Sequence, residues 1–297
     1  MKNIHLEHPE DTILTGDLSV LNWFTADSTL SVKIDGSPAI VWGTNPANNR
    51  FFVGTKSVFN KIKIKINHSH EEIDQNHEGE VATILHACMN SLSHTDCIYQ
   101  GDFIGFGGND IYCPNTITYK FSDVIQQSII IAPHTIYHAE NDLRDAVARP
   151  DSTVWKDTSH VKFVRPTVSL TSHLEDLQEV CSFAKQMATT CTFVNDKETS
   201  VIKKQLNACF RTQSEISEND FTCDKNLIRL WKLVESIKND LMFLIRVSDD
   251  VKCFIDERET LHEGYVMVND YGMHKLVNRY VFSYNNFNQI KKSWNLK

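Results

Sequence analysis

The hydrophobic and polar positions of this chain change their period along its length. From Ser28 to about Ile136, short runs such as TLSVKI, RFFVG and TITYKF alternate apolar and polar residues, and Asn, Gly and Pro separate them. Alternation with a period of two predicts half-buried β-strands joined by turns. The apolar run from Ser128 to Ala132 predicts a buried strand, whereas Glu80 to Leu92 repeats its apolar residues every three or four positions and predicts a helix.

Helical periodicity dominates from about Ser172 to Val247. Its last part, NLIRLWKLVESIKNDLMFLIRV, places seven apolar residues at spacings of three and four and predicts a long amphipathic helix. The strand pattern returns from Val251, where the alternating runs EGYVMV and MHKLVNRYVF are joined by NDYG. An Asn-Asp pair and a Gly between two such runs predict a β-hairpin.

These changes of period divide the chain into residues 1–170, a helical segment at 171–250, and residues 251–297. The simplest arrangement is one α+β domain with a helical insertion, in which strands on both sides of the insertion belong to the same sheets. A separate helical domain is the alternative. At 297 residues the chain is long enough for either division.

Composition and charge exclude several classes of protein. Hydrophobic residues make up 41% and charged residues 23% of the chain, as in ordinary globular proteins. The chain has no apolar stretch of bilayer length and no apolar N-terminal signal segment, so we expect a cytoplasmic protein without a membrane partner. We also expect a monomer. The eight cysteines have no zinc spacing and indicate reduced thiols. A net charge of -8 requires any nucleic-acid contact to use a local basic surface.

The segment SVKIDGSP, from Ser31 to Pro38, carries the candidate chemistry. Alternation places Lys33 and Asp35 on the same face at a strand end, and Gly36 permits a sharp turn against a ligand. A lysine held there can attack an α-phosphate if its ammonium group loses a proton. On its own the pattern K-x-D-G also fits a surface lysine before a turn.

Further motifs follow in an order that resembles the superfamily of ATP-dependent DNA and RNA ligases and mRNA capping enzymes. KIDG at Lys33 resembles the first motif, whose lysine becomes the nucleotidyl-lysine. QGDF at Asp102 resembles the third, whose carboxylate contacts the ribose or a divalent metal. EGYVMV at Glu263 resembles the fourth, whose carboxylate coordinates the catalytic metal. Lys275, in MHKLVNR, matches the lysine of the fifth motif, which binds the α-phosphate.

Other positions match the superfamily less closely. Lys56, in GTKS, stands where the superfamily has a short basic motif that contacts the nucleotide or a 5′-phosphate. His134 is the planar residue nearest to the position of the purine-stacking aromatic ring, and a histidine satisfied by local hydrogen bonds is an equal interpretation. Val277 replaces the second lysine of the fifth motif, for which Arg279 is a distant substitute. Pro38 replaces an arginine that many DNA ligases have.

The resemblance implies two antiparallel sheets flanking a nucleotide cleft, and an ATP-dependent polynucleotide ligase. Lys33 would attack the α-phosphate of ATP, with Mg²⁺ or Mn²⁺ held by Glu263 and Asp102. AMP would pass to a 5′-phosphate end, and a 3′-hydroxyl would displace it. The alternatives are a GTP-dependent capping-type enzyme, a transferase with another acceptor, and a non-catalytic protein that binds nucleotides or nucleic-acid ends.

The end of the chain departs from the superfamily pattern. About fifteen residues follow Phe282, so we find no counterpart of the usual C-terminal OB-fold. The helical segment could replace it as a clamp on nucleic acid, or it could serve only as a structural insertion. The short hairpin between Glu263 and Lys275 resembles RNA-ligase and phage-type members, and several segments look similar to proteins of large tailed phages, which would act in the host-cell cytoplasm.

A lysine-rich segment bears on nucleic-acid binding. NKIKIKIN, from Asn60 to Asn67, alternates perfectly and predicts a strand with Lys61, Lys63 and Lys65 on one face and three isoleucines in the core. Together with Lys56, these lysines could contact a phosphate backbone. Alternatively, they belong to a charged edge strand that discourages aggregation.

Overall fold

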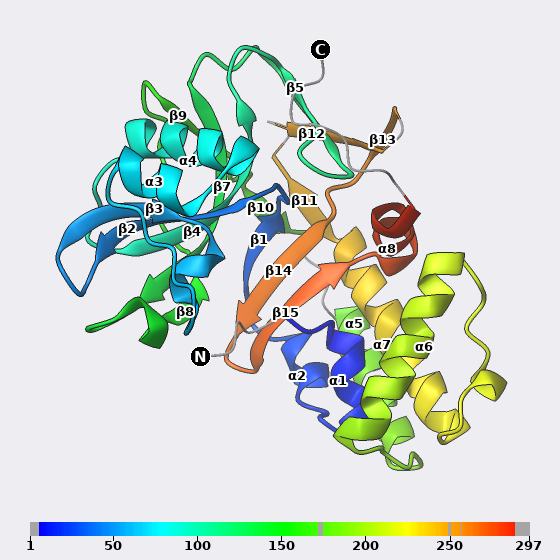
Figure 1. The fold of residues 1–297 in the computed structure, drawn as a ribbon. Helices are drawn as coiled ribbons and strands as arrows, with labels where there is room; N and C mark the ends of the chain where they lie inside the picture. The colour runs from blue at the N-terminus through cyan, green and yellow to red at the C-terminus, as the bar shows by residue number, and fades with distance from the viewer. Residues whose placement is uncertain (1–5, 172–174, 249–250, 256, 289–297) are drawn as a thin grey trace.

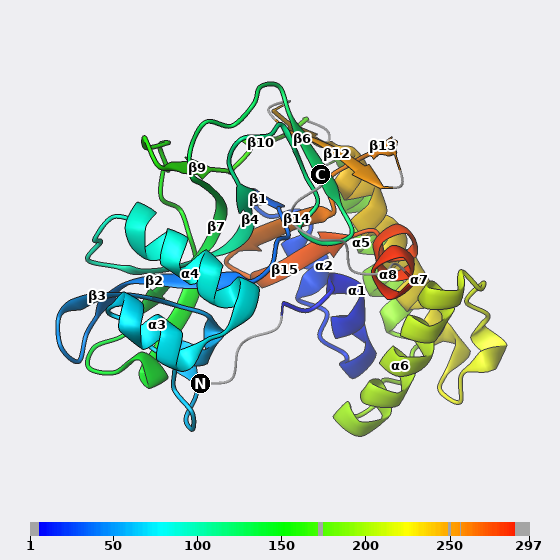
Figure 2. The same cartoon turned by 45° about the horizontal axis from the view of Figure 1, so that its top comes forward.

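The protein combines antiparallel sheets with two groups of helices, and the computed structural model describes residues 6–171, 175–248, 251–255 and 257–288. One group of helices lies on a large sheet, the other lies at the opposite end of the molecule, and a small sheet stands between them (Figure 1). Figure 2 shows the same arrangement from another side. The predicted α+β class is confirmed.

The large sheet contains the strands of the first third of the chain. Along the sheet the order is β3 (Arg50–Gly54), β2 (Ala39–Asn45), β4 (Ile98–Phe106), β7 (Ile129–His138) and β8 (Val147–Pro150), all antiparallel to their neighbours. A further strand, β9 (Val161–Phe163), runs parallel to the start of β7.

Two helices, α3 (His70–Asn76) and α4 (Gly79–Ser91), pack on one face of this sheet. Ile73 of α3 and Leu85 of α4 are fully buried against the core side chains Trp42 and Phe103. The predicted helix at residues 80–92 corresponds to α4, and the predicted buried strand corresponds to β7, whose first residues have no exposed surface.

The small sheet has the order β1 (Thr29–Lys33), β14 (Gly264–Asn269) and β15 (Gly272–Val277). β14 and β15 form the predicted hairpin, with its turn at residues 270–271. Tyr265, Met267 and Leu276 point from one face of this sheet into the core of the second group of helices. By alternation, the opposite face carries Lys33 and Lys275.

Strands from before and after the helical segment pair with each other in two more sheets. The first has the order β13 (Arg258–Thr260), β12 (Val251–Ile255), β6 (Thr118–Phe121) and β5 (Ile111–Tyr112). The second consists of β10 (Val168–Leu170) and β11 (Ile245–Val247). The start and end of the chain are therefore joined by backbone hydrogen bonds around the helical segment.

The second group of helices shares one core with the small sheet. It contains α1 (Pro9–Thr12), α2 (Val20–Trp23), α5 (Glu175–Ala188), α6 (Asp196–Thr212), α7 (Lys225–Phe243) and α8 (Arg279–Asn288). The short 3-10 helices are Ile13–Thr15, Lys56–Phe59, Leu143–Asp145 and Glu218–Asp220. The predicted amphipathic helix is α7, but it ends at Phe243, because the β-branched Ile245 and Val247 pair with β10 instead.

The predicted strand at residues 60–67 is wrong. Ile62 is 80% exposed and Ile64 37% exposed, so these side chains do not enter the core. Lys63 has a left-handed backbone with φ of 56°, which breaks an extended strand. Asn67 alone bridges to Val53 of β3. The alternating pattern lacks a second backbone to pair with, and a strand needs such a partner for its hydrogen bonds.

Candidate functional site

Lys33 lies at the end of β1, directly opposite Gly264 of β14. Its Nζ atom forms ion pairs with Asp35 Oδ1 and, at 3.0 Å, with Glu263 Oε2. The side chains of Lys33, Asp35 and Glu263 are 24%, 30% and 8% exposed. Two segments from opposite ends of the chain therefore place an amine between two carboxylates.

Two glycines allow the backbones around Lys33 to approach closely. A Cβ atom at Gly36 would overlap the carbonyl oxygen of Phe103 in β4, and one at Gly264 would overlap the carbonyl oxygen of Leu276 in β15. The turn after β1 therefore packs directly on the large sheet, and β14 packs directly on β15. The glycines of the K-x-D-G and E-G motifs therefore have a steric role, because any larger residue would prevent these close backbone approaches.

Tyr119 and Asn115 hold the backbone of Asp35. The hydroxyl of Tyr119 accepts a hydrogen bond from Asp35 N–H at 2.9 Å and donates one to Asp35 C=O at 3.0 Å, while Asn115 Nδ2 donates to the same carbonyl at 3.2 Å. Tyr119 is 1% exposed and belongs to β6. Sequence analysis missed both residues, although alternation in TITYKF indicates an inward-facing tyrosine.

Asp102 and His134 continue the site onto the large sheet. Asp102 Oδ2 accepts a hydrogen bond from Gly36 N–H at 3.2 Å, and its Oδ1 lies 3.6 Å from His134 Nε2. The same His134 nitrogen lies 3.3 Å from Nε2 of the buried Gln100, whose Oε1 accepts from Tyr137 at 2.7 Å. His134 is 39% exposed at this position, so its ring is accessible as well as locally bonded.

Lys275 extends from the same face of the small sheet as Lys33. Its backbone partner in β14 is Val266, and its N–H donates to Glu7 C=O at 3.2 Å. Burial lowers the pKa of Lys275, and the positive charges of Lys33 and Arg279 lower it further. The two lysines therefore lie close enough for each charge to act on the other.

The protonation of the Lys33 cluster follows from burial and charge. Burial alone lowers the pKa of Lys33, but the carboxylates of Asp35 and Glu263 outweigh this effect and raise its pKa above the ordinary value. Burial opposes the charged form of Asp35 too, but Lys33 holds the pKa of that carboxyl below its usual value. Burial and the nearby charge of Asp35 raise the pKa of Glu263 to about 8. At neutral pH the cluster holds an ammonium, a carboxylate and a largely protonated Glu263.

Glu263 is placed by a neighbouring buried pair. Cys253 Sγ in β12 lies 3.2 Å from Nδ1 of His262, the residue just before Glu263. Burial lowers the pKa of His262 to about 4 and raises the pKa of Cys253 to about 12, so both groups are neutral at physiological pH. This neutral contact adds no charge to the Lys33 cluster.

The structure brings together most of the residues singled out from the sequence. Direct contacts join Lys33, Asp35, Gly36, Asp102, His134 and Glu263, and Lys275 faces the same region. Lys56, Lys61 and Lys63 are exposed on the segment after β3 and make no contact with this cluster within the described residues. Lys65 instead donates to Asn76 C=O at 2.5 Å, so the predicted ladder of lysines along one strand face is wrong.

Arg279 is not a phosphate-facing substitute for the missing second lysine. It is 2% exposed and pairs with Asp11 at 2.9 Å and Glu10 at 3.2 Å, while its Nη2 donates to Asn207 at 2.8 Å. Its guanidinium also lies over the ring of Phe210. The Arg279 guanidinium is therefore buried between helices, where two carboxylates compensate its charge in place of solvent.

A metal ion at the Lys33 cluster would have to be held by few protein ligands. The described residues contain no group of three or more His, Cys, Asp or Glu side chains arranged to hold one. Asp35 and Glu263 do present two carboxylates to one amine. Mg²⁺ is commonly held by one or two carboxylates together with substrate phosphates, so this donor set fits that ion.

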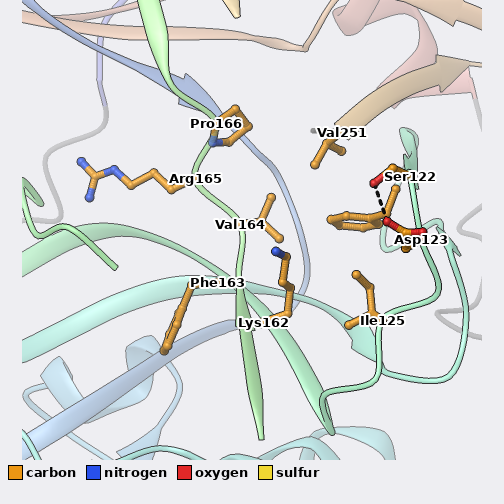
Figure 3. A pocket seen from close by; sticks show the side chains of 10 residues that line it. Ser122, Asp123, Ile125, Lys162, Phe163, Val164, Arg165, Pro166 and Val251 are labelled. Atoms are coloured by element: carbon orange, nitrogen blue, oxygen red, sulfur yellow. Dashed lines mark hydrogen bonds between the residues drawn. The ribbon is translucent and has the colours of Figure 1, made fainter. Parts of the chain in front are cut away.

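A cavity of about 240 Å³ lies apart from the Lys33 cluster. Ile125, Val164 and Val251 form apolar walls, and Lys162 and Asp123 contribute polar groups (Figure 3). The figure shows the guanidinium of Arg165 turned away from the cavity; it is bound to Asp151 and to the carbonyl of Thr153. The cavity shares no lining residue with the Lys33 cluster.

Comparison with known protein families gives a match over most of the chain. The sequence profile of a family of unknown function, DUF6267, matches residues 3–226 and 200–291. No curated protein and no solved structure matches the chain. Among the described helices, none is both long enough and apolar enough to cross a membrane.

Proposed function

The chain belongs to the DUF6267 family, whose function is unknown, and we propose that it is an ATP-dependent polynucleotide ligase that carries AMP on Lys33. One observation supports this most strongly. The Lys33 amine is held between Asp35 and Glu263, on the sheet face that also carries Lys275. The contacts of an amine with two acids, beside a second lysine, suit a reaction at a phosphate.

In the first step the lone pair of Lys33 Nζ attacks the α-phosphorus of ATP. A bond forms between nitrogen and phosphorus, the bond from that phosphorus to the bridging oxygen breaks, and pyrophosphate leaves. The amine must first lose a proton. Glu263 Oε2, 3.0 Å away, can accept that proton once its own has gone, and its raised pKa makes it a stronger base than the closer carboxylate of Asp35.

Mg²⁺ would be held by Asp35 and Glu263 rather than by the Glu263 and Asp102 expected from the sequence. Asp35 and Glu263 share the Lys33 amine, whereas Asp102 binds the Gly36 N–H and lies near His134. When bound, it would favour the ionised form of Glu263, offset the negative charge that holds Lys33 as an ammonium, and reduce the charge on the phosphates. Lys275, with its lowered pKa, would bind the α-phosphate and stabilise the charge that develops there. The ring of His134 would lie against the adenine base of ATP. Asp102 would orient the turn at Gly36 through the hydrogen bond that its carboxylate accepts from Gly36 N–H.

The second half of the proposed reaction uses a nucleic acid with 5′-phosphate and 3′-hydroxyl ends. A 5′-phosphate oxygen attacks the phosphorus bound to Lys33, and the amine leaves as AMP is transferred. The 3′-hydroxyl then attacks the activated 5′-phosphate and AMP departs. Lys56, Lys61 and Lys63 are exposed cations that can contact the phosphate backbone, although they do not share a strand.

Covalent labelling tests the first step directly. The protein is incubated with Mg²⁺ and ATP or GTP labelled in the α-phosphate, denatured, and examined for label that remains bound. We expect labelling with ATP, complete loss in Lys33→Ala, and a loss of 100-fold or more in rate in Lys275→Ala, in line with the loss of one group that stabilises a transition state. Lys204→Ala, at an exposed lysine of α6 outside the cluster, is the matched control and should label normally.

The outcomes separate the alternatives. Labelling with GTP and not ATP supports a capping-type enzyme. Labelling with ATP but no sealing of nicked DNA, nicked RNA or single-stranded RNA supports another acceptor. Nucleotide binding without any covalent label contradicts the proposal and favours a non-catalytic binding protein.

A further inference from the structure

Two histidines on the outer helical layer face each other across the contact between α3 and α4. His70 Nδ1 lies 2.7 Å from His86 Nδ1, and the two rings are stacked with their centroids 5.0 Å apart. Both helices lie on the far side of the large sheet from the small sheet, so this pair is separate from the Lys33 cluster (Figure 1).

The outer nitrogen of each ring has its own acceptor. His86 Nε2 lies 2.9 Å from Asp74 Oδ1, and His70 Nε2 lies 3.1 Å from Asn90 Oδ1. A carboxylate and an amide oxygen only accept hydrogen bonds, so each Nε2 must carry the hydrogen. A neutral imidazole with hydrogen on Nε2 has a lone pair on Nδ1. If both rings are neutral, the two Nδ1 atoms therefore point lone pairs at each other.

Two lone pairs at this separation repel unless a cation lies between them. A proton can fill this role if one ring is charged, and a metal ion can fill it with both rings neutral. Zn²⁺ binds imidazole nitrogen at about 2.0–2.1 Å, which separates two nitrogens of a tetrahedral site by about 3.3 Å. The pair would open by about 0.6 Å to accept the ion, a movement that exposed side chains on two helix surfaces can make.

The surrounding residues form the outer shell that metal-binding histidines require. Such a histidine donates its second ring nitrogen to a carboxylate or a carbonyl oxygen, which fixes the tautomer and raises the basicity of the coordinating nitrogen. Asp74 serves His86 and Asn90 serves His70. Along α3, Asp74 follows His70 by four residues, so both lie on one helix face. Along α4, Asn90 follows His86 by four residues in the same way.

We propose that His70 and His86 bind one divalent transition-metal ion of the Zn²⁺ class through their Nδ1 atoms, with water completing the coordination. Asp74 and Asn90 hold the rings without touching the ion. Imidazole ligands favour Zn²⁺, Cu²⁺ and Ni²⁺ over Mg²⁺, so this site is distinct from a Mg²⁺ bound with a nucleotide. The ion would join α3 to α4 above the core residues Ile73 and Leu85.

Calorimetric titration of the full chain with Zn²⁺ tests this site. We expect one equivalent to bind, an affinity unaffected by excess Mg²⁺, and loss of that equivalent in His70→Gln and in His86→Gln. Asp74→Asn should weaken binding by about 10-fold, because the outer carboxylate no longer supports His86. His160→Gln, at an exposed histidine on the approach to β9, is the control and should bind as the unchanged protein does.

Histidine side-chain ¹⁵N spectra add a readout that is independent of affinity. Zn²⁺ should shift Nδ1 of His70 and His86 and leave their Nε2 atoms protonated. Binding that survives in both glutamine variants, or coordination through Nε2, overturns the proposal. Absence of a Zn²⁺-dependent change also overturns it, and then the two rings share a proton. None of these outcomes depends on whether Lys33 carries a nucleotide.

Discussion

At the scale of single residues, the proposed chemistry rests on three titratable side chains whose environments push their pKa values apart. Lys33 and Asp35 stabilise each other's charged forms, whereas Glu263 is left with burial and a negative neighbour. Acid–base catalysis uses a group that gains and loses a proton near neutral pH, and Glu263 is such a group beside the Lys33 amine. The sequence located all three residues, but burial decided which of them holds the extra proton.

Glu263 makes the free energy of unfolding depend on pH in a defined direction. Its pKa is about 8 in the folded protein and near 4.5 in the unfolded chain, so the folded state binds more protons between these values. The contribution of Glu263 is present below pH 4.5 and is lost as pH rises through about 8. Glu263→Gln keeps a neutral side chain at all pH values and removes this dependence.

Denaturant unfolding of both proteins between pH 5 and 9 measures the effect. We expect the advantage of the unchanged protein over Glu263→Gln to shrink as pH rises, by a few kcal/mol at most, since one pKa unit corresponds to about 1.4 kcal/mol. Histidines titrate in both proteins and cancel in the difference. Parallel pH curves would show that Glu263 ionises at an ordinary pH.

At the scale of elements, the strand pair β5–β6 supports the turn that follows Lys33. Tyr112 of β5 and Tyr119 of β6 are cross-strand partners, and each hydroxyl accepts from a backbone N–H and donates to a backbone carbonyl. Tyr119 does this with Asp35, and Tyr112 does it with Asn109. The two tyrosines therefore offer a comparison in which the hydrogen bonds match and only the proximity to Lys33 differs.

Replacing each tyrosine by phenylalanine separates positioning from stability. Both changes leave buried backbone groups with one partner fewer, and each should cost about 1–3 kcal/mol of unfolding free energy. Only Tyr119→Phe should also slow the labelling of Lys33 by ATP, by about 10-fold or more, because the Asp35 turn loses its clamp. Labelling rates are compared at temperatures where both variants remain folded. Equal rates in the two variants would remove Tyr119 from the positioning of the site.

At the scale of the whole molecule, a buried ionic network fastens the N-terminal segment to the helices. Lys238 of α7 and Glu10 of α1 have no exposed side-chain surface, and their ion pair measures 2.7 Å. Arg279 of α8 contacts Glu10 and Asp11, and Trp231 Nε1 donates to Asp11 at 3.1 Å. Because β15 leads into α8 and lies beside the N-terminal segment, this network fixes the strand that carries Lys275.

Breaking this network should destabilise the protein strongly. Lys238→Ala leaves Glu10 buried without its nearest cation, and we expect a loss of about 3–5 kcal/mol of unfolding free energy. Lys252→Ala is the control, since its pair with Glu259 is exposed and should contribute about 0–1 kcal/mol. Chemical denaturation followed by circular dichroism measures both variants. A small loss in Lys238→Ala would mean that Arg279 alone compensates Glu10.

The sequence predicted the elements whose pattern is decided locally. Apolar spacing located α4 and α7, and the NDYG turn located the β14–β15 hairpin. The local pattern gave a wrong prediction at residues 60–67. Alternation there predicts a strand, but only Asn67 bridges to a neighbouring strand. At residues 245–247 the pattern predicts a helix, but these residues form a strand. Their strand partner, β10, lies far away in the chain, so the local pattern gives no sign of it.

The sequence by itself therefore determined which residues could do chemistry, because residue type, spacing and turn-forming glycines are local properties. Tertiary structure decided the rest. It paired β1 with β14, buried Glu263, placed Tyr119 against Asp35, diverted Arg279 into the helices and brought His70 to His86. Each of these outcomes depends on burial or on a partner distant in the chain, and the free energy of a charge or a hydrogen bond is set by those surroundings.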